Sequence, residues 1–338
     1  MILPIESNVY VETERLPRIA TKPERKTSIF KELKMHSRRI GVILLNAFFG
    51  HTWIYFLIGL ANKYIFNKPI KSIFMLYPAN EKYTKAYVYL WYARSMKWKP
   101  RLVGLLKQNE KWGFIFGISA TEEDFANPEN ISNLKKVEAR LERIKILLGA
   151  DQKTFAGILP GIFFSKGIVA NPIERDVTVK AVIQALGKIR ANEGLPLDVT
   201  VIVLGGEGFI GSTLRKVGNS IYGNFYSLDM GEEEHFLALT EKLRGKPIIL
   251  LNVTKKGALS FYTPYLWPEV VVVNEVYPEP NDKELADIKA RGATCYHIIG
   301  TKGKAWPGFP RGYAGGIPCC ASFWPQDGRG YDVLIKKL

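Results

Sequence analysis

The sequence predicts an α/β protein in which a Rossmann-type parallel sheet domain follows a smaller α/β domain with a basic, aromatic and apolar N-terminal region. Three observations carry this prediction. The chain has 338 residues, which is enough for two buried cores. Short apolar runs alternate with helix-like segments through its second half, and a glycine-rich turn follows the first of these runs.

The predicted organisation has four parts. Residues 1–37, with three prolines among mixed charges, indicate an extended arm. We expect residues 38–190 to form an N-terminal substrate or acyl domain and residues 191–300 to form the dinucleotide-binding domain. Residues 301–338 are expected to return to the cleft between them.

Composition excludes disordered and fibrous classes, because 47% of the residues are hydrophobic and 23% are charged. The net charge of +15 is uneven: residues 1–111 hold 20 Lys/Arg against 7 Asp/Glu, which is +13 of the total. This favours an anionic partner for the N-terminal third, such as an anionic membrane surface. Nucleic acid is a weak alternative, because the aromatic residues alternate with aliphatic ones rather than with Lys or Arg.

A run of 23 residues without a charged side chain, at 40–62, is long enough to cross a bilayer. Asn46, His51, Asn62 and three glycines dilute it, so we favour core or membrane-surface packing over a true span. Peripheral attachment stays open. Because the preceding residues are polar, no secretion signal is expected, and the dinucleotide-binding part is expected in the cytoplasm.

Metal and disulfide chemistry are not expected. The three cysteines, Cys295, Cys319 and Cys320, cannot form a disulfide framework, and the adjacent pair is sterically unsuited to bridging. The four histidines are scattered and match no zinc spacing.

In the first half, hydrophobic periodicity predicts alternating strands and helices. They are a strand at 72–78, an aromatic helix-like segment at 85–98, a hairpin at 101–118, an amphipathic helix at 134–148 that Gly149 ends, an apolar strand at 154–164, and a helix capped by Asp176.

The nucleotide-binding prediction rests on the turn that follows the buried strand 199–204. Gly206, Gly208 and Gly211 fit G-x-G-x-x-G, which supplies a tight turn, close approach to a pyrophosphate and close helix packing. The next helix directs its N-terminal amides at the phosphates. The turn residues Phe209 and Ile210 are included in the predicted site.

A second strand ends at Asp229, 21 residues after Gly208, where an acidic side chain binds the ribose hydroxyls. This favours NAD over NADP, with NADP left open. Thr254, on the loop after the next strand, completes the predicted cofactor site. Glu207 is unfavourable inside a phosphate turn and is expected to point to solvent.

Alternation continues to residue 300 and predicts a parallel sheet. The expected elements are helices at 232–244, 258–266 and 281–292 and strands at 247–253, 270–276 and 294–300. A sheet whose glycine turn binds nothing is the disfavoured alternative, because the strand, the glycines and the acid occur together at the required spacing.

Two stretches, LLNVTKKGAL (250–259) and VVVNEVYPEPNDKELADIKARGATCYHIIG (271–300), resemble the amino-acid-dehydrogenase-like branch of Rossmann proteins, which includes shikimate dehydrogenases. Over residues 100–322 the layout is similar to that of long-chain acyl-carrier-protein reductases. This resemblance implies reduction of an acyl thioester to an aldehyde through a cysteine thioester, with IPCCAS matching Cys320 or Cys319. It also implies an acidic acyl-carrier protein as partner.

The candidate catalytic residues are therefore Cys320, or failing that Cys319, as the nucleophile. His297, at the end of the last predicted parallel strand, could act as acid or base, or only pack. Lys302 and Lys256 follow strands and could orient a carbonyl or phosphate, although most lysines solvate a surface.

Three functions compete. The first is NAD(P)H-dependent reduction of an acyl thioester, and the second is non-covalent dehydrogenation of a small hydroxy or amino substrate. The third is a membrane-associated nucleotide-binding protein without turnover. A homo-oligomer is left open.

Overall fold

The computed structural model describes residues 29–78, 81–229, 231–323 and 330–338. Most of the predicted N-terminal arm lies outside these residues. Its end is not extended: helix α1 (Ile29–Phe49) begins within it and runs into the apolar segment. The prediction for residues 29–37 is therefore wrong, because the apolar residues that follow continue one helix rather than starting a new element.

The first sheet has the strand order β10-β2-β3-β1-β4. Strands β1, β3 and β4 are parallel, and β2 and β10 add in antiparallel fashion. The hairpin predicted at 101–118 is confirmed as β2 and β3. The strands are β1 (Ile70–Leu76), β2 (Arg101–Gln108), β3 (Lys111–Gly117), β4 (Gln152–Phe155) and β10 (Lys304–Trp306).

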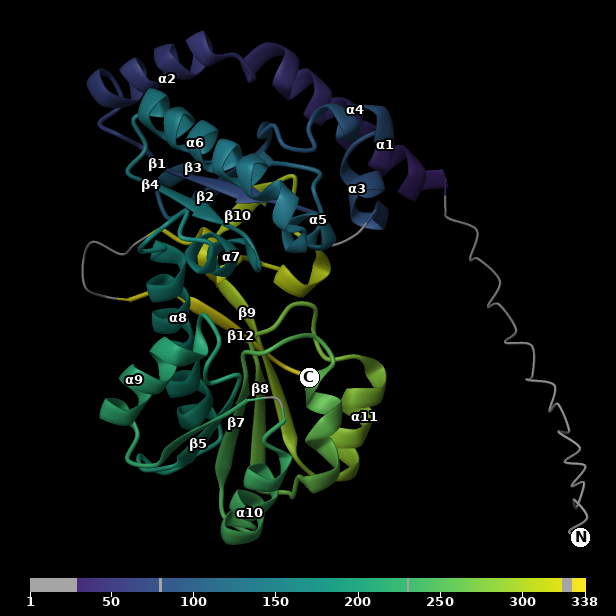
Figure 1. The fold of residues 1–338 in the computed structure, drawn as a ribbon, viewed down its shortest axis with the longest axis vertical. Helices are drawn as coiled ribbons and strands as arrows, with labels where there is room; N and C mark the ends of the chain where they lie inside the picture. Colours follow the sequence, from purple (N-terminus) through teal and green to yellow (C-terminus); the bar gives the residue numbers. More distant parts are fainter. Residues whose placement is uncertain (1–28, 79–80, 230, 324–329) are drawn as a thin grey trace, which may run out of the picture.

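Helices surround this sheet, with α1 and α2 across its outer end in Figure 1. The strand predicted at 154–164 is wrong beyond Phe155, because a helix that starts at Leu159 has Pro160 in its first turn, where no N–H is needed. Gly149 ends α6 with a left-handed φ of +63°, as predicted. The helices are α2 (Thr52–Tyr64), α3 (Glu81–Tyr87), α4 (Leu90–Ser95), α5 (Glu122–Ala126), η1 (Pro128–Asn130), α6 (Ile131–Leu148) and α7 (Leu159–Ser165).

The second sheet is the parallel Rossmann-type sheet that the sequence predicted. Its order is β11-β9-β8-β7-β5-β6, with β12 also paired to β9. Strands β5 to β9 are parallel, and β11 and β12 are antiparallel to β9. The strands are β5 (Thr200–Leu204), β6 (Phe225–Leu228), β7 (Ile248–Asn252), β8 (Val270–Asn274), β9 (Thr294–Lys302), β11 (Gly316–Ile317) and β12 (Val333–Lys337).

Both faces of this sheet are buried, which explains its continuous apolar strands. Two predictions for its helices are wrong. Asp176 does not cap α8, which starts three residues earlier after Pro172, and residues 258–266 form two short 3-10 turns because Pro264 interrupts helical bonding. The elements are α8 (Ile173–Asn192), α9 (Gly211–Ile221), α10 (Glu233–Leu243), η2 (Ala258–Phe261), η3 (Thr263–Tyr265) and α11 (Asp282–Ala290).

Segments cross between the two sheets. Helix α8 shares a core with β5 and β7 of the second sheet, although it precedes the division predicted at residue 190. After β9, the chain turns back as β10 and adds to the first sheet. The predicted domain limits stay a prediction. Because of these crossings, segments of both sheets border the region between them.

Within the described part of the chain, no single helix is long and apolar enough to cross a membrane. Helices α1 and α2 reach the required length and composition only together. They are bent by 78° at the break between Phe49 and Thr52.

Candidate active site

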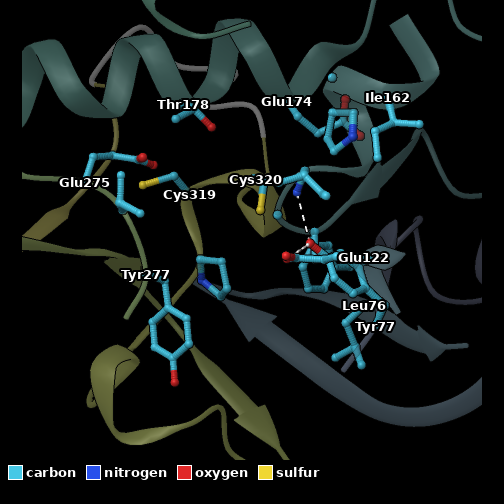
Figure 2. A pocket seen from close by; sticks show the side chains of 18 of the residues that line it. Leu76, Tyr77, Glu122, Ile162, Glu174, Thr178, Glu275, Tyr277, Cys319 and Cys320 are labelled. Atoms are coloured by element: carbon cyan, nitrogen blue, oxygen red, sulfur yellow. Dashed lines mark hydrogen bonds between the residues drawn. The ribbon is translucent and has the colours of Figure 1, made fainter. Parts of the chain in front are cut away.

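A cavity of about 1390 Å³ lies between the two sheets. It is lined by the end of β1, by the loops that follow β5, β7 and β8, and by the segment containing Cys319 and Cys320. The carboxyl ends of parallel strands are where open α/β sheets bind ligands. Figure 2 shows side chains from the end of β1, from α8 and from the loop after β8 around the cysteine pair.

The glycine turn after β5 has the backbone geometry that its sequence predicts. Gly205 has a φ of +95°, and a Cβ there would lie 2.7 Å from Cγ2 of Thr254. A Cβ on Gly211 would lie 1.9 Å from the Gly205 carbonyl oxygen, so α9 starts against the strand end only because residue 211 lacks a side chain. Gly208 lines the cavity, and a Cβ there would meet only that same oxygen, at 3.2 Å. Space for a ligand therefore remains in front of Gly208.

The G-x-G-x-x-G spacing did not identify Gly205, although two consecutive glycines directly after a strand were a signal for it. Of the remaining predicted turn residues, Gly206 is buried beside Ser227 of β6. Phe209 and Ile210 both line the cavity. The predicted turn residues 206, 208, 209, 210 and 211 therefore form one continuous loop around the carboxyl end of β5.

Asp229 lies directly after β6 and lines the cavity. Its Oδ2 accepts a hydrogen bond of 2.8 Å from the backbone N–H of Glu207, which holds the carboxylate at the turn. Glu207 is exposed and forms an ion pair with Arg215, which balances its charge. The position of Asp229 fits the acid that binds ribose hydroxyls in dinucleotide sites.

Thr254 lies on the other side of the turn, at the point where the strand order reverses around β5. Its hydroxyl donates to Oδ1 of Asn252 at 2.7 Å, and the Asn252 amide donates to Oδ1 of Asn274 at 2.8 Å. These bonds join the ends of β7 and β8. The loops after β5 and β7 diverge here, and such a reversal forms the crevice used by ligands.

Arg175, in the first turn of α8, was missed as a site residue. It lines the cavity, with its guanidinium 5.1 Å from the ring of Phe164 and 5.7 Å from that of Phe209. Its Nε is buried and has no hydrogen-bond partner among the described residues. A cation held by two rings beside the glycine turn can bind an anion such as a pyrophosphate. The helix predicted from the sequence was capped by Asp176, so Arg175 preceded that helix and had no predicted role.

Cys319 and Cys320 lie together in the cavity wall on the three-residue turn η5 (Cys319–Ala321). Burial is the main cause that raises the pKa of both thiols, to about 12 for Cys320. The Glu174 and Glu275 carboxylates raise the pKa of Cys320 further, while a hydrogen bond from the Gly157 N–H opposes them. Both cysteines are therefore thiols, not thiolates, at neutral pH.

The two carboxylates were also missed. Glu174 is 3% exposed and accepts a 2.7 Å hydrogen bond from the N–H of Phe155, while Glu275 directly follows β8. Burial raises the pKa of each to about 7. In Figure 2, Glu275 lies beside Cys319 and Glu174 lies beyond Cys320. A polar residue after the VVVVN strand was a signal for Glu275, whereas nothing in the sequence marked Glu174.

Two tyrosines add hydroxyl groups to the wall. Tyr77 donates to Oε1 of Glu122 at 3.0 Å and accepts from the N–H of Ile158 at 3.1 Å. Tyr277 stacks on Tyr313 with ring centroids 4.8 Å apart. Burial raises the pKa of Tyr77 and Tyr277, so both hydroxyls stay protonated.

His297 and Lys302 do not line this cavity. Strand β9 continues to Lys302, so His297 is not at a strand end as predicted. His297 is 1% exposed and hydrogen-bonded to Asn274, and burial lowers its pKa. The Lys302 side chain is 72% exposed and pairs with Asp332. Lys256 is exposed where it lines the cavity. Among the described residues, no group of three His, Cys, Asp or Glu side chains could hold a metal ion.

Comparison with known proteins identifies no family for this chain. No protein-family profile matches the chain, and no curated protein matches it. Among solved structures, the chain is similar to the hetero-hexameric glutamate dehydrogenase from Thermus thermophilus in its leucine-bound form, with 13% identity and a TM-score of 0.34. The match covers 67% of this chain and 64% of that one, so it spans less than two thirds of the dehydrogenase. Similarity of this degree carries no argument about activity.

Proposed function

We propose that this protein is an NAD(P)-dependent oxidoreductase. One observation carries the proposal: a single cavity holds a glycine turn at a strand-order reversal, an acid after the neighbouring strand, and a cluster of thiols and carboxylates. Binding and reacting groups are thereby brought together although they lie far apart in the sequence.

The residues present fit a dinucleotide. Gly208 leaves space at the turn, and the unpartnered buried Nε of Arg175 is available to a phosphate oxygen. Asp229 would bind the ribose, which favours NAD over NADP, and Thr254 would contact the part of the cofactor that enters the cavity. When bound, the nicotinamide would supply or accept the hydride.

The finer proposal is reduction of an acyl thioester to an aldehyde. The Cys320 sulfur, or failing that the Cys319 sulfur, attacks the thioester carbonyl, and the carrier thiol leaves with a proton. Bound NAD(P)H would supply the hydride that reduces the new thioester; the aldehyde would then leave, and the cysteine thiolate would take up a proton from solvent to restore the thiol. The deep apolar wall suits a long acyl chain; it includes Phe74, Val88, Met96, Ile115 and Phe309.

Attack by sulfur requires that the thiol lose its proton, because the thiolate is the nucleophile. Glu275 is the proposed proton acceptor. It lies beside the cysteine pair and its pKa of about 7 lets it take and return a proton near neutral pH. The Gly157 N–H that donates to Cys320 stabilises the thiolate that forms.

A non-covalent dehydrogenase is the second candidate, favoured by the raised pKa of both thiols. In that case Glu275, with Tyr277, would move the substrate proton, and the cysteines would only shape the cavity. His297 and Lys302 are no longer candidates for this step, because neither lines the cavity.

Cysteine dependence separates the two candidates. Purified protein is incubated with a long-chain acyl thioester without cofactor, and the masses of its tryptic peptides are measured by mass spectrometry. An acyl mass increment on the peptide containing Cys319 and Cys320 is expected, together with thioester-dependent oxidation of NADH or NADPH. If a Cys319→Ala, Cys320→Ala variant oxidises cofactor as fast as wild type, the covalent route is wrong and the second candidate stands. If neither protein binds or oxidises cofactor, the oxidoreductase proposal itself fails.

A further inference from the structure

Helices α1 and α2 have an unusual distribution of side chains. Twelve large apolar residues between 33 and 66 are 40% to 72% exposed, about half of all exposed large apolar residues in the described part of the chain. In α2, Trp53, Phe56 and Leu60 are exposed, whereas the opposite face buries Gly59 and Asn62. A helix on the surface of a water-soluble protein normally buries its apolar face and exposes its polar face.

Buried asparagines explain why the small and polar face of each helix points inward. Asn46 of α1 bonds both the N–H and the carbonyl of Leu102 in β2. Asn62 of α2 accepts from the N–H of Ile70 at 2.9 Å and donates to the carbonyl of Leu148 at 3.1 Å. These bonds fix both helices to the first sheet and to α6. The asparagines that seemed to dilute the apolar run therefore hold its apolar face outward.

The charge along these two helices is mainly positive, with Glu32 in the first turn of α1 as their one acid. From residue 33 to residue 80 the chain contains six Lys/Arg and no Asp or Glu. Lys34, Lys63 and Lys68 are exposed within or next to the two helices. An apolar face that is bordered by cations matches a bilayer with anionic headgroups.

We propose that α1 and α2 form a docking face that inserts into one leaflet of an anionic membrane without crossing it. A crossing would require the inner faces to leave β2 and α6, and with them the hydrogen bonds of Asn46 and Asn62. The 78° bend lets both helices lie along one surface. An exposed apolar patch of this size marks an interaction site rather than ordinary surface.

This face also lies next to the cavity. Val42 of α1 packs in one cluster with Val88 and Met96, which line the apolar end of the cavity. Docking would thus place the cavity wall close to the lipid surface. The docking proposal does not depend on the proposed reaction, since it is tested by binding alone.

The test uses the full chain and co-sedimentation with two kinds of vesicle, phosphatidylcholine alone and phosphatidylcholine mixed with phosphatidylglycerol. Wild type is expected to bind the anionic vesicles more strongly, and less so as salt rises. A Phe48→Ser, Trp53→Ser, Phe56→Ser variant should lose about a hundredfold or more in partitioning. The control, Leu197→Ser, Ile221→Ser, Phe261→Ser, removes similarly exposed side chains elsewhere and should bind like wild type.

A second measurement covers the case in which the triple variant does not fold. Bromine-labelled lipid should quench the tryptophan fluorescence of wild type, and Trp53→Phe should remove much of that quenching while leaving binding intact. The proposal fails if wild type does not bind anionic vesicles at low salt, or if both triple variants lose binding equally. It also fails if the face captures an acidic carrier protein or a second copy of the chain, seen by light scattering, but not vesicles.

Discussion

At the scale of single residues, the chemistry of the cavity depends on the balance between burial and charge. Cys319 and Cys320 share a wall with Glu174 and Glu275. Burial raises the pKa of all four groups, and the carboxylates raise the pKa of the thiols further because a second negative charge is unfavourable there. At neutral pH the two thiols are therefore protonated, whereas each carboxyl is partly ionised. The sequence predicted the cysteines but not the carboxylates, so it could not predict this balance.

The raised pKa values predict the alkylation pattern of the three cysteines. Iodoacetamide should react slowly at neutral pH and faster as pH rises towards 9, since only the thiolate reacts. Cys320, which is partly exposed in the cavity, should be labelled before the buried Cys295. Glu275→Gln removes a charge that raises the thiol pKa values, so it should speed labelling while slowing turnover. Peptide mass spectrometry measures the rate of alkylation. If Glu275→Gln were labelled more slowly than wild type, Glu275 would not be raising the pKa of the thiols.

Glu174 should make stability depend on pH. Its pKa is raised from 4.5 to about 7 in the folded protein, so its contribution to stability is fully present below about pH 4.5 and is lost as pH rises through 7. Glu174→Gln keeps an oxygen for the Phe155 N–H but cannot ionise. The melting temperature of the variant minus that of wild type should therefore increase from pH 5 to pH 8. A constant difference, measured by differential scanning fluorimetry, would exclude ionisation of Glu174 in this range.

At the scale of elements, local patterns predicted the central parallel strands well, because the apolar runs of β5, β7 and β8 are buried on both faces of one sheet. Predictions failed where an apolar run included proline. Pro160 lies in the first turn of a helix within a predicted strand, and Pro264 divides a predicted helix into two turns. Composition alone does not distinguish these cases, since proline both starts and interrupts helices.

Substitutions in the glycine turn should separate binding from folding. Gly208→Val places a side chain in the cavity with its Cβ 3.2 Å from the Gly205 carbonyl oxygen, so we expect loss of NADH binding with a smaller loss of stability than a Cβ at residue 211 causes. Gly211→Ala directs a Cβ into the Gly205 carbonyl oxygen and should lower the free energy of unfolding by roughly 1–3 kcal/mol. Fluorescence titration and urea unfolding measure the two effects. Wild-type affinity in Gly208→Val would show that the turn is not the cofactor site.

Asp229 tests the choice of cofactor. Its carboxylate, held by the Glu207 N–H, would bind the ribose hydroxyls of NADH and repel the phosphate of NADPH. Asp229→Ala should therefore weaken NADH more than NADPH, and Asp229→Asn is the matched variant that keeps an oxygen for the turn. Equal loss of both cofactors in parallel titrations would remove the argument for NAD.

At the scale of the whole molecule, the site exists only because distant segments meet. Glu174 and Arg175 on α8, the turn after β5 and the cysteine segment are separated by up to about 150 residues, and no local pattern shows that they face one cavity. The C-terminal segment is held by both sheets. Gln108 of β2 donates to Thr301 of β9 at 3.0 Å and accepts from the N–H of Phe323 at 2.7 Å.

This bridge predicts that stability and thiol access are coupled. Gln108 is buried, so Gln108→Ala should leave the N–H of Phe323 without its acceptor and the Thr301 hydroxyl with only its bond to Ser322, and should lower the free energy of unfolding by about 1–3 kcal/mol. Loosening the segment between them should also speed alkylation of Cys320 relative to Cys295. The matched control is Gln152→Ala, which removes one partly buried bond to the carbonyl of Ser322 and should have smaller effects. Urea unfolding and peptide mass spectrometry are run on both variants. A Gln108→Ala protein that is destabilised without faster Cys320 labelling would mean that the cysteine segment is fixed by its contacts with α8 rather than by the bridge between the sheets.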